Sequence, residues 1–176
     1  MDDRPVAGRK AVQPGLALPA AIAGGMAHQL KPNATLTSAA KITIAPLDVG
    51  RAERLLNAIR KRHGSDKVCL LASVQDVAAR HSAAMAQRGR LAHDFGAGSS
   101  LRDRLANVEP HSMAAENVGA GYSTLESVLK GWMVSRGHWR NMADSRLTHF
   151  GLAMATNPGS RNRNYWTLIM IRPNLA

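Results

Sequence analysis

Residues 150–171, FGLAMATNPGSRNRNYWTLIMI, contain two apolar runs separated by a stretch that is rich in turn-forming residues. The runs Phe150–Thr156 and Tyr165–Ile171 are typical of strands, and Asn157-Pro158-Gly159-Ser160 is typical of a turn. Neighbouring residues of a strand point to opposite faces of a sheet, and neither face is distinctly polar here. A sheet that is apolar on both faces needs cover on both, so we expect a helix, sheet, helix arrangement.

The chain before these strands shows helical periodicity in four places. The expected helix starts are an N-cap at Asp48, a capping box of Ser73 with Asp76, Ser99 or Ser100, and a capping box of Ser123 with Glu126. Three glycines are expected to end helices: Gly64, Gly89 and Gly137. The run 60–62 places positive charge in the last turn of the first helix, where it opposes the negative end of the dipole, and we expect this run to form solvated surface.

Composition excludes several classes of protein. A chain of 176 residues suits one domain with an extension, and Cys69 as the single cysteine cannot form an internal disulfide. We expect Cys69 to be a small buried apolar residue. No apolar stretch is long enough for a transmembrane span. The net charge of +11 favours anionic neighbours, and sequence-specific nucleic-acid recognition is disfavoured because no recognition motif is present.

The segment 1–45 differs from the remainder of the chain. Arg9-Lys10 precedes a weakly apolar stretch from Leu16 to Ala27, which is the order of a signal peptide. Acidic residues near the start and prolines within the stretch weaken that match. Two interpretations stay open: a leader for export, or a flexible segment that buries too little apolar surface to fold. The predicted domain covers residues 46–172.

Polar residues that could carry chemistry lie in three short segments. His93 belongs to the first, Glu116 with Asn117 to the second, and Ser135, His138 and Asn141 to the third. Imidazole and carboxylate groups suit zinc, and three protein ligands would leave one position for water. The separations of 23 residues between His93 and Glu116, and 22 between Glu116 and His138, form no local metal motif. His81, on the apolar stripe of the second helix, is expected to be packed and hydrogen-bonded.

The order of these segments resembles the CAP superfamily (cysteine-rich secretory protein, antigen 5 and pathogenesis-related 1) in its bacterial branch. The matching pieces cover about Leu47 to Arg172. They are Ala79-Arg80-His81-Ser82-Ala83-Ala84-Met85-Ala86, His93-Asp94, Arg104, Glu116-Asn117-Val118-Gly119, Trp132-x-x-Ser135-x-Gly137-His138-x-x-Asn141-Met142, Gly151 and Tyr165-Trp166. The resemblance implies an α/β fold: a three-layer α-β-α sandwich around a mostly antiparallel sheet, with a large cleft.

The resemblance also implies a set of cleft residues. His93 and His138 match two histidines that hold zinc or another divalent ion in some members, and Glu116 matches an acidic residue beside them. Ser135 stands where many eukaryotic members have a second acid, which removes a negative charge and puts tight metal binding in doubt. Glu116 is either a metal ligand, a hydrogen-bond acceptor that fixes a histidine tautomer, or part of a structural polar cluster. Asn141 is expected to tie its loop to neighbouring backbone.

Two functions compete for this cleft. The favoured one is an exported, periplasmic or extracellular binding module that is not catalytic. Its cleft and basic surface would engage an anionic cell-wall polymer or a lipid. The alternative is a hydrolase in which Zn²⁺ on His93 and His138 activates water, with Glu116 as the base. No serine or cysteine nucleophile motif is present in the sequence.

Overall fold

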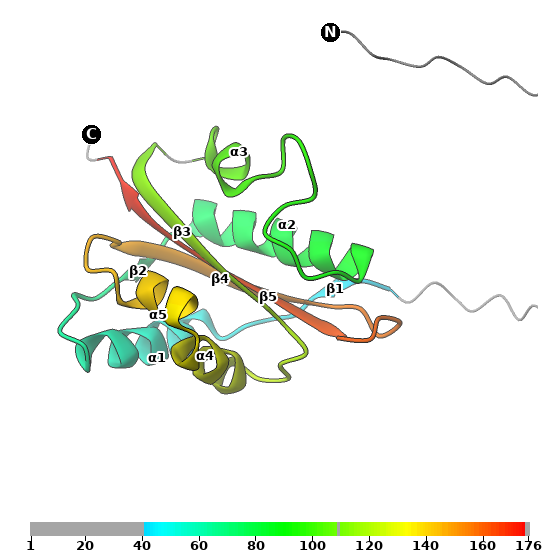
Figure 1. Cartoon of the computed structure of the whole chain (residues 1–176), viewed down its shortest axis with the longest axis horizontal. Coiled ribbons are helices and arrows are strands. Elements are labelled where there is room, and N and C mark those ends of the chain that lie inside the picture. Colours follow the sequence, from blue (N-terminus) through cyan, green and yellow to red (C-terminus); the bar gives the residue numbers. More distant parts are fainter. Residues whose placement is uncertain (1–40, 109, 175–176) are drawn as a thin grey trace, which may run out of the picture. The chain divides into compact units, whose positions relative to one another are not determined.

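The computed structural model describes residues 41–108 and 110–174 (Figure 1). The signal-peptide prediction lies outside these residues. In chain order the elements are β1 (Thr43–Ile44), α1 (Val49–Lys61), β2 (Cys69–Leu70), α2 (Ala72–Arg88), α3 (Leu101–Leu105), β3 (His111–Ala120), α4 (Leu125–Val134), α5 (Arg136–Ala143), β4 (His149–Thr156) and β5 (Asn164–Pro173). The four expected helical regions and both expected strands are present. The sheet already begins at β1, upstream of residue 46.

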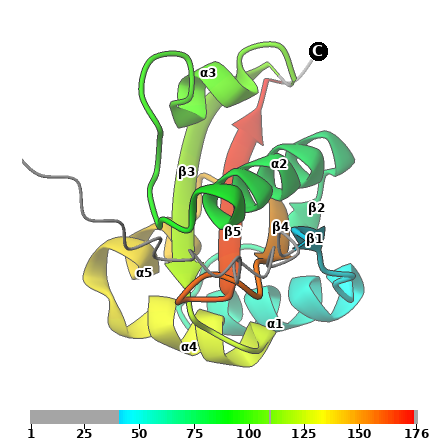
Figure 2. The same ribbon diagram turned by 90° about the vertical axis from the view of Figure 1, so that its right-hand side faces the viewer.

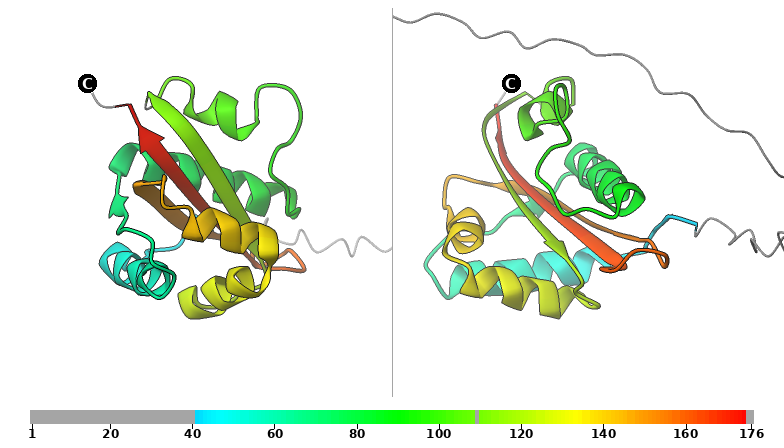
Figure 3. Two further views of the ribbon diagram at one scale, coloured as in Figure 1. Left: turned by 60° about the vertical axis from the view of Figure 1, so that its left-hand side comes forward. Right: turned by 45° about the vertical axis from the view of Figure 1, so that its right-hand side comes forward.

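The strands form one sheet in the order β1-β4-β5-β3, and the short β2 also pairs with β4. All pairs are antiparallel except β2 with β4. The predicted three-layer sandwich with a mostly antiparallel sheet is therefore confirmed. Figures 1 and 3 show α2 and α3 on one side of the sheet and α1, α4 and α5 on the other. In Figure 2, β3, β5 and β4 run side by side behind α2.

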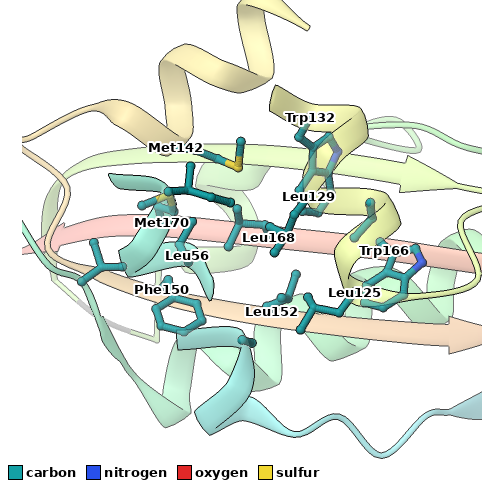
Figure 4. Close-up of a cluster of buried hydrophobic side chains, with 14 of the residues drawn as sticks. Leu56, Leu125, Leu129, Trp132, Met142, Phe150, Leu152, Trp166, Leu168 and Met170 are labelled. Atoms are coloured by element: carbon teal, nitrogen blue, oxygen red, sulfur yellow. The ribbon is translucent and has the colours of Figure 1, made fainter. Parts of the chain in front are cut away.

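Alternate residues of β5 pack against the helices on opposite faces of the sheet. Trp166, Leu168 and Met170 belong to a large core with residues of α1 and α4 (Figure 4). Ile169 and Ile171 pack with Val74, Val77 and Ala78 of α2. These side chains are almost fully buried on both faces. The absence of a polar face in the strand pattern thus predicts the two covering layers correctly.

Helix α2 lies so close to β4 that no side chain fits between their backbones. A Cβ built on Gly151 would lie 2.4 Å from the backbone nitrogen of Gln75 and 2.6 Å from the carbonyl oxygen of Val74. The side chain of Gln75 strengthens the contact, because its amide nitrogen donates to the carbonyl of Leu152 at 2.7 Å and its oxygen accepts from the Leu152 amide at 2.7 Å. Gly151 therefore sets the spacing between the sheet and α2.

Two expected capping boxes and one expected helix end are wrong. Helix α2 starts directly after β2: its N-cap is Leu71, without a side-chain cap, rather than Ser73. Thr124, not Ser123, caps α4, and Ser127 completes that box. In both cases the backbone path into the helix, which the pattern does not reveal, selects the cap.

Gly137 does not terminate a helix. Ser135 has extended backbone angles and ends α4, and α5 begins at the next residue, so Gly137 lies inside α5. Helix α3 begins at Ser100, one of the two expected positions, with Asp103 completing a capping box.

Arg60 differs most from its expected position. Its side chain is fully buried instead of facing solvent at the end of α1. Its guanidinium donates to the carbonyl oxygens of Asp66 at 2.6 Å, Met142 at 2.7 Å, Asp144 at 3.1 Å and Leu147 at 3.1 Å. The acceptors are carbonyls of loops and of a helix end, so Arg60 joins α1 to the connection between α5 and β4.

The prediction that Cys69 is buried is also wrong. It is exposed, because the two-residue strand β2 lies at the rim of the sheet. Across the described ranges, no helix is long and apolar enough to cross a membrane.

Candidate functional site

Glu116 is the centre of a charged cluster on the α2 side of the sheet. It lies on β3 opposite Ile169, and its carboxylate side chain is only 4% exposed. The Nδ1–H of His93 donates to Oε1 at 2.9 Å. The Nη1 of Arg104 is 2.7 Å from Oε2, and the Nε2 of His81 is 3.9 Å from the same oxygen. A buried carboxylate needs such partners, since burial alone penalises its charge.

Arg104 organises the loop that carries His93. From α3, its Nε donates to the Ser99 carbonyl at 3.1 Å and its Nη2 donates to the His93 carbonyl at 3.0 Å. The remaining Nη1 faces Glu116. One guanidinium thus fixes both ends of the segment 93–99 and pairs with the carboxylate, a use that suits the planar fork of arginine. Sequence reasoning noted Arg104 only as part of a resemblance and gave it no place in the site.

His81 also contacts this cluster. Its Nε2–H donates to the Ala92 carbonyl at 3.0 Å, and the residue is 2% exposed, as expected for a packed histidine on the stripe of α2. The 3.9 Å contact of His81 with Glu116 was not anticipated. Its position on the sequence stripe gave no signal for it, because only the register of β3 brings Glu116 beneath α2.

His138 lies on α5, on the other side of the sheet. The Nδ2 of Asn117 donates to the His138 carbonyl at 3.0 Å, and the ring of His138 lies 6.4 Å from that of Trp132, centroid to centroid. The Nδ2 of Asn141 donates to the Glu116 carbonyl at 3.1 Å and to the Oδ1 of Asn117 at 2.9 Å. These two asparagines tie α5 to the edge strand β3.

Ser135 takes part through its backbone. Its N–H donates to the Trp132 carbonyl at 3.2 Å, and its own carbonyl accepts from the Trp139 amide at 2.8 Å. It therefore links the end of α4 to the start of α5 and so positions the turn that precedes His138.

The two site histidines have pKa values shifted in opposite directions. The hydrogen bond to Glu116 raises the pKa of His93. Burial, and then the charge of His93, lower the pKa of His138. Burial would raise the pKa of Glu116, but the hydrogen bond from His93 and the ion pair with Arg104 lower it overall. As the pH falls, His93 is therefore the first of these two histidines to become protonated.

These shifts predict a pH window. The raised pKa of His93 stabilises the fold below its ordinary value of 6.5, and this contribution is lost as the pH rises through the raised value. The lowered pKa of Glu116 stabilises the fold above its ordinary value of 4.5, and this contribution is lost as the pH falls through the lowered value. Between pH 4.5 and 6.5, His93 is thus protonated and Glu116 ionised, so both contributions to stability are present.

Proton NMR titration of the imidazole signals checks this assignment. We expect the pKa of His93 to lie above 6.5 and that of His138 below it. Glu116→Gln removes the charge partner and should lower the pKa of His93. Glu126→Gln is the matched control, because Glu126 pairs with Arg51 at 2.6 Å instead. A His93 that titrates below His138 in the wild-type protein would contradict the assignment.

The residues around His93 and His138 do not fit a three-ligand zinc site. Both oxygens of Glu116 are held by His93 and Arg104, and Ser135 is no typical zinc ligand. In the part of the chain that the structure describes, no three His, Cys, Asp or Glu side chains are grouped to hold a metal ion. A Glu116 with a lowered pKa is also a poor general base. Zinc binding by His93 and His138 stays a prediction, and no hydrolytic step is derived from it.

The geometry agrees with one of the three roles considered for Glu116. The carboxylate accepts from the Nδ1–H of His93, which leaves the Nε2 of that ring as its free position. The His93 side chain is 60% exposed, so the ring is accessible to solvent. The arrangement can present a cationic imidazole at the surface, fixed from behind by a buried carboxylate.

Comparison with known proteins agrees with this layout. The profile of the cysteine-rich secretory protein (CAP) family matches residues 53–170, two thirds of the chain and all of the site. The chain belongs to the CAP family. This CAP domain is 31% identical over 121 residues to the uncharacterized membrane protein YlbC of Bacillus subtilis, a match that covers 67% of this chain and 32% of that protein.

Solved structures of bacterial origin share the CAP fold. An extracellular protein containing a SCP domain from Bacillus anthracis superposes with a TM-score of 0.61 at 29% identity, over 70% of this chain and 39% of that one. An outer surface protein from Borrelia burgdorferi has a TM-score of 0.64 at 12% identity, over 75% of this chain and 100% of that one, and shows the fold alone. The chain spans about a third to a half of the length of the curated relatives it matches.

Proposed function

We propose that this CAP-domain protein is an exported, non-catalytic binding module for anionic groups of the cell envelope, in a polymer or a lipid headgroup. The observation that carries the proposal is the state of Glu116. Because His93 and Arg104 already pair with this carboxylate, the acid is engaged within the protein and offers a ligand little negative charge. An approaching anion meets the exposed ring of His93 instead.

The remainder of the chain supports the same ligand class. The net charge is +11, so the long-range field attracts anions. Export is favoured because a similar structure, at 29% identity, is that of an extracellular protein. Fractionation of cells tests this part: the protein is expected outside the cytoplasm, and recovery in the cytoplasm with Met1 intact would contradict it.

Retention on lipid vesicles tests the binding. We expect the full chain to sediment with vesicles that contain phosphatidylglycerol and not with pure phosphatidylcholine. Binding should fall steeply toward about 1 M salt, where the screening length is ~3 Å. His93→Gln should weaken retention, while His149→Gln, a histidine on β4 outside the cluster, should not. Retention that is indifferent to salt, or equal for both variants, would overturn the proposal.

A further inference from the structure

A separate cavity lies on the α2 side of the sheet, between α2, the loop that follows it and α3. Its volume is about 290 Å³, close to the lower end of the range for small-molecule sites, roughly 300–1,000 Å³. It excludes His93, His138 and all of α5. The polar and aromatic residues of its lining are Arg80, His81, Arg88, Phe95, Ser99 and Arg104.

The lining of this cavity is positively charged, and the charge is only partly compensated. Among the residues that the structure describes, three arginines line the cavity and no aspartate or glutamate does. Arg104 is neutralised by Glu116 at 2.7 Å. Arg80 and Arg88 form no ion pair with any carboxylate in the described ranges, in contrast to Arg51, Arg104 and Arg146. A concave site with unpaired charge of one sign concentrates counter-ions, so this cavity favours an anion.

Arg80 and Arg88 reach the cavity from one face of α2. Arg80, Ala84 and Arg88 follow one another at intervals of four residues, the spacing that aligns side chains on a helix, and all three line the cavity. The guanidinium of Arg88 lies over the ring of Phe95, 4.4 Å from the centroid. This stacking holds Arg88 in place before any ligand arrives, which lowers the entropic cost of binding.

The other lining residues indicate that the part of the ligand outside its anionic group is apolar. Val77, Ala84 and Phe95 supply apolar contact. His81 adds no charge in neutral solution, because burial lowers its pKa and its Nε2–H is engaged by the Ala92 carbonyl. Two unpaired guanidinium groups match the charge of a phosphate monoester, about −1.5 to −2 near neutral pH, better than that of a single carboxylate.

We propose that this cavity binds a small phosphate monoester, with Arg80 and Arg88 holding the phosphate and the apolar wall contacting its organic stem. This proposal does not use the exposed ring of His93 on which the proposed function rests, although the cavity shares His81 and Arg104 with the cluster around Glu116. Either one can fail without the other, because vesicle retention through His93 and binding in this cavity use different side chains.

Calorimetric titration of the full chain tests the cavity with phenyl phosphate as the probe. We expect saturable binding, and a dissociation constant raised about tenfold or more in Arg80→Gln/Arg88→Gln, since charge-assisted hydrogen bonds are lost. The matched control is Arg161→Gln/Arg172→Gln. It removes the same net charge from exposed positions on the turn and on β5, and it should bind like the wild-type protein.

Two further probes distinguish the source of the phosphate. Inorganic phosphate should bind more weakly than phenyl phosphate if the apolar wall contributes. Short-chain phosphatidic acid that binds more tightly than phenyl phosphate would assign the site to a lipid headgroup, and weaker binding would assign it to a soluble ester. The proposal is overturned if phenyl phosphate gives no heat above buffer, or if both double variants lose binding equally.

Discussion

Replacing Glu116 with alanine should lower the free energy of unfolding by about 3–5 kcal/mol, the range for removing one partner of a buried ion pair. The cause is Arg104, whose side chain is only 13% exposed and would keep its charge without a carboxylate. Because Arg104 also holds the carbonyls of His93 and Ser99, the loop they belong to should loosen as well. Urea unfolding followed by circular dichroism measures the loss.

A matched variant separates this effect from simple charge removal. Glu126→Ala also breaks a glutamate–arginine pair, but Glu126 and Arg51 are both solvent-exposed. Exposed pairs contribute little because water and salt screen them, so the urea midpoint should barely move. Equal losses in the two variants would show that Glu116 is not the buried centre described here.

The Gly151→Ala substitution should destabilise the fold by about 3 kcal/mol or more, or prevent folding, because the added methyl group would overlap the backbone of α2. The nearest atoms, at 2.4–2.6 Å, are backbone atoms of Val74 and Gln75, which cannot turn aside as a flexible side chain would. The helix would have to move away from β4, and the core between them would open. Thermal unfolding of the purified variant measures this.

Gly137→Ala is the counterpart of this substitution. No atom of the described residues lies within 4 Å of a Cβ built at Gly137, and this glycine lies inside α5. Alanine there should raise stability by up to about 1 kcal/mol, since glycine is the poorer helix former. If Gly137→Ala folds and Gly151→Ala does not, the loss of folding is due to the position of Gly151 and not to the way the variants were prepared. Similar melting temperatures for both variants would refute the close contact.

Periodicity was sufficient to predict the layers. The stripe of α2 and the two-faced strands β4 and β5 are encoded locally, as residue spacings of 3.6 and 2. Strand β3 was not predicted, because its first half mixes small and polar residues and only pairing with β5 makes it a strand. Propensity is a weak signal for such a segment, and tertiary context decides.

In the candidate site, too, some residues could be predicted from the sequence and others could not. His93, Glu116, His138 and the asparagines could be picked out from their segments. The roles of Arg104 and His81 could not, because both depend on how the loop 89–100 folds back over β3. Arg60 shows the same limit: an arginine in a last helical turn looks solvated in sequence, but three of its four carbonyl partners lie 82–87 residues further along the chain.

The positions of Glu116 and Asn117 on β3 have a consequence for strand alignment. The two residues are neighbours, yet Glu116 faces the α2 layer and Asn117 faces α5. A slip of β3 by one position in one direction would put the amide of Asn117 against Arg104, and a slip in the other direction would put the carboxylate of Glu116 against the backbone of His138. Both exchanges would leave charged or hydrogen-bonding groups without matching partners. The polar contacts on the two faces of β3 therefore fix its register, in addition to apolar packing.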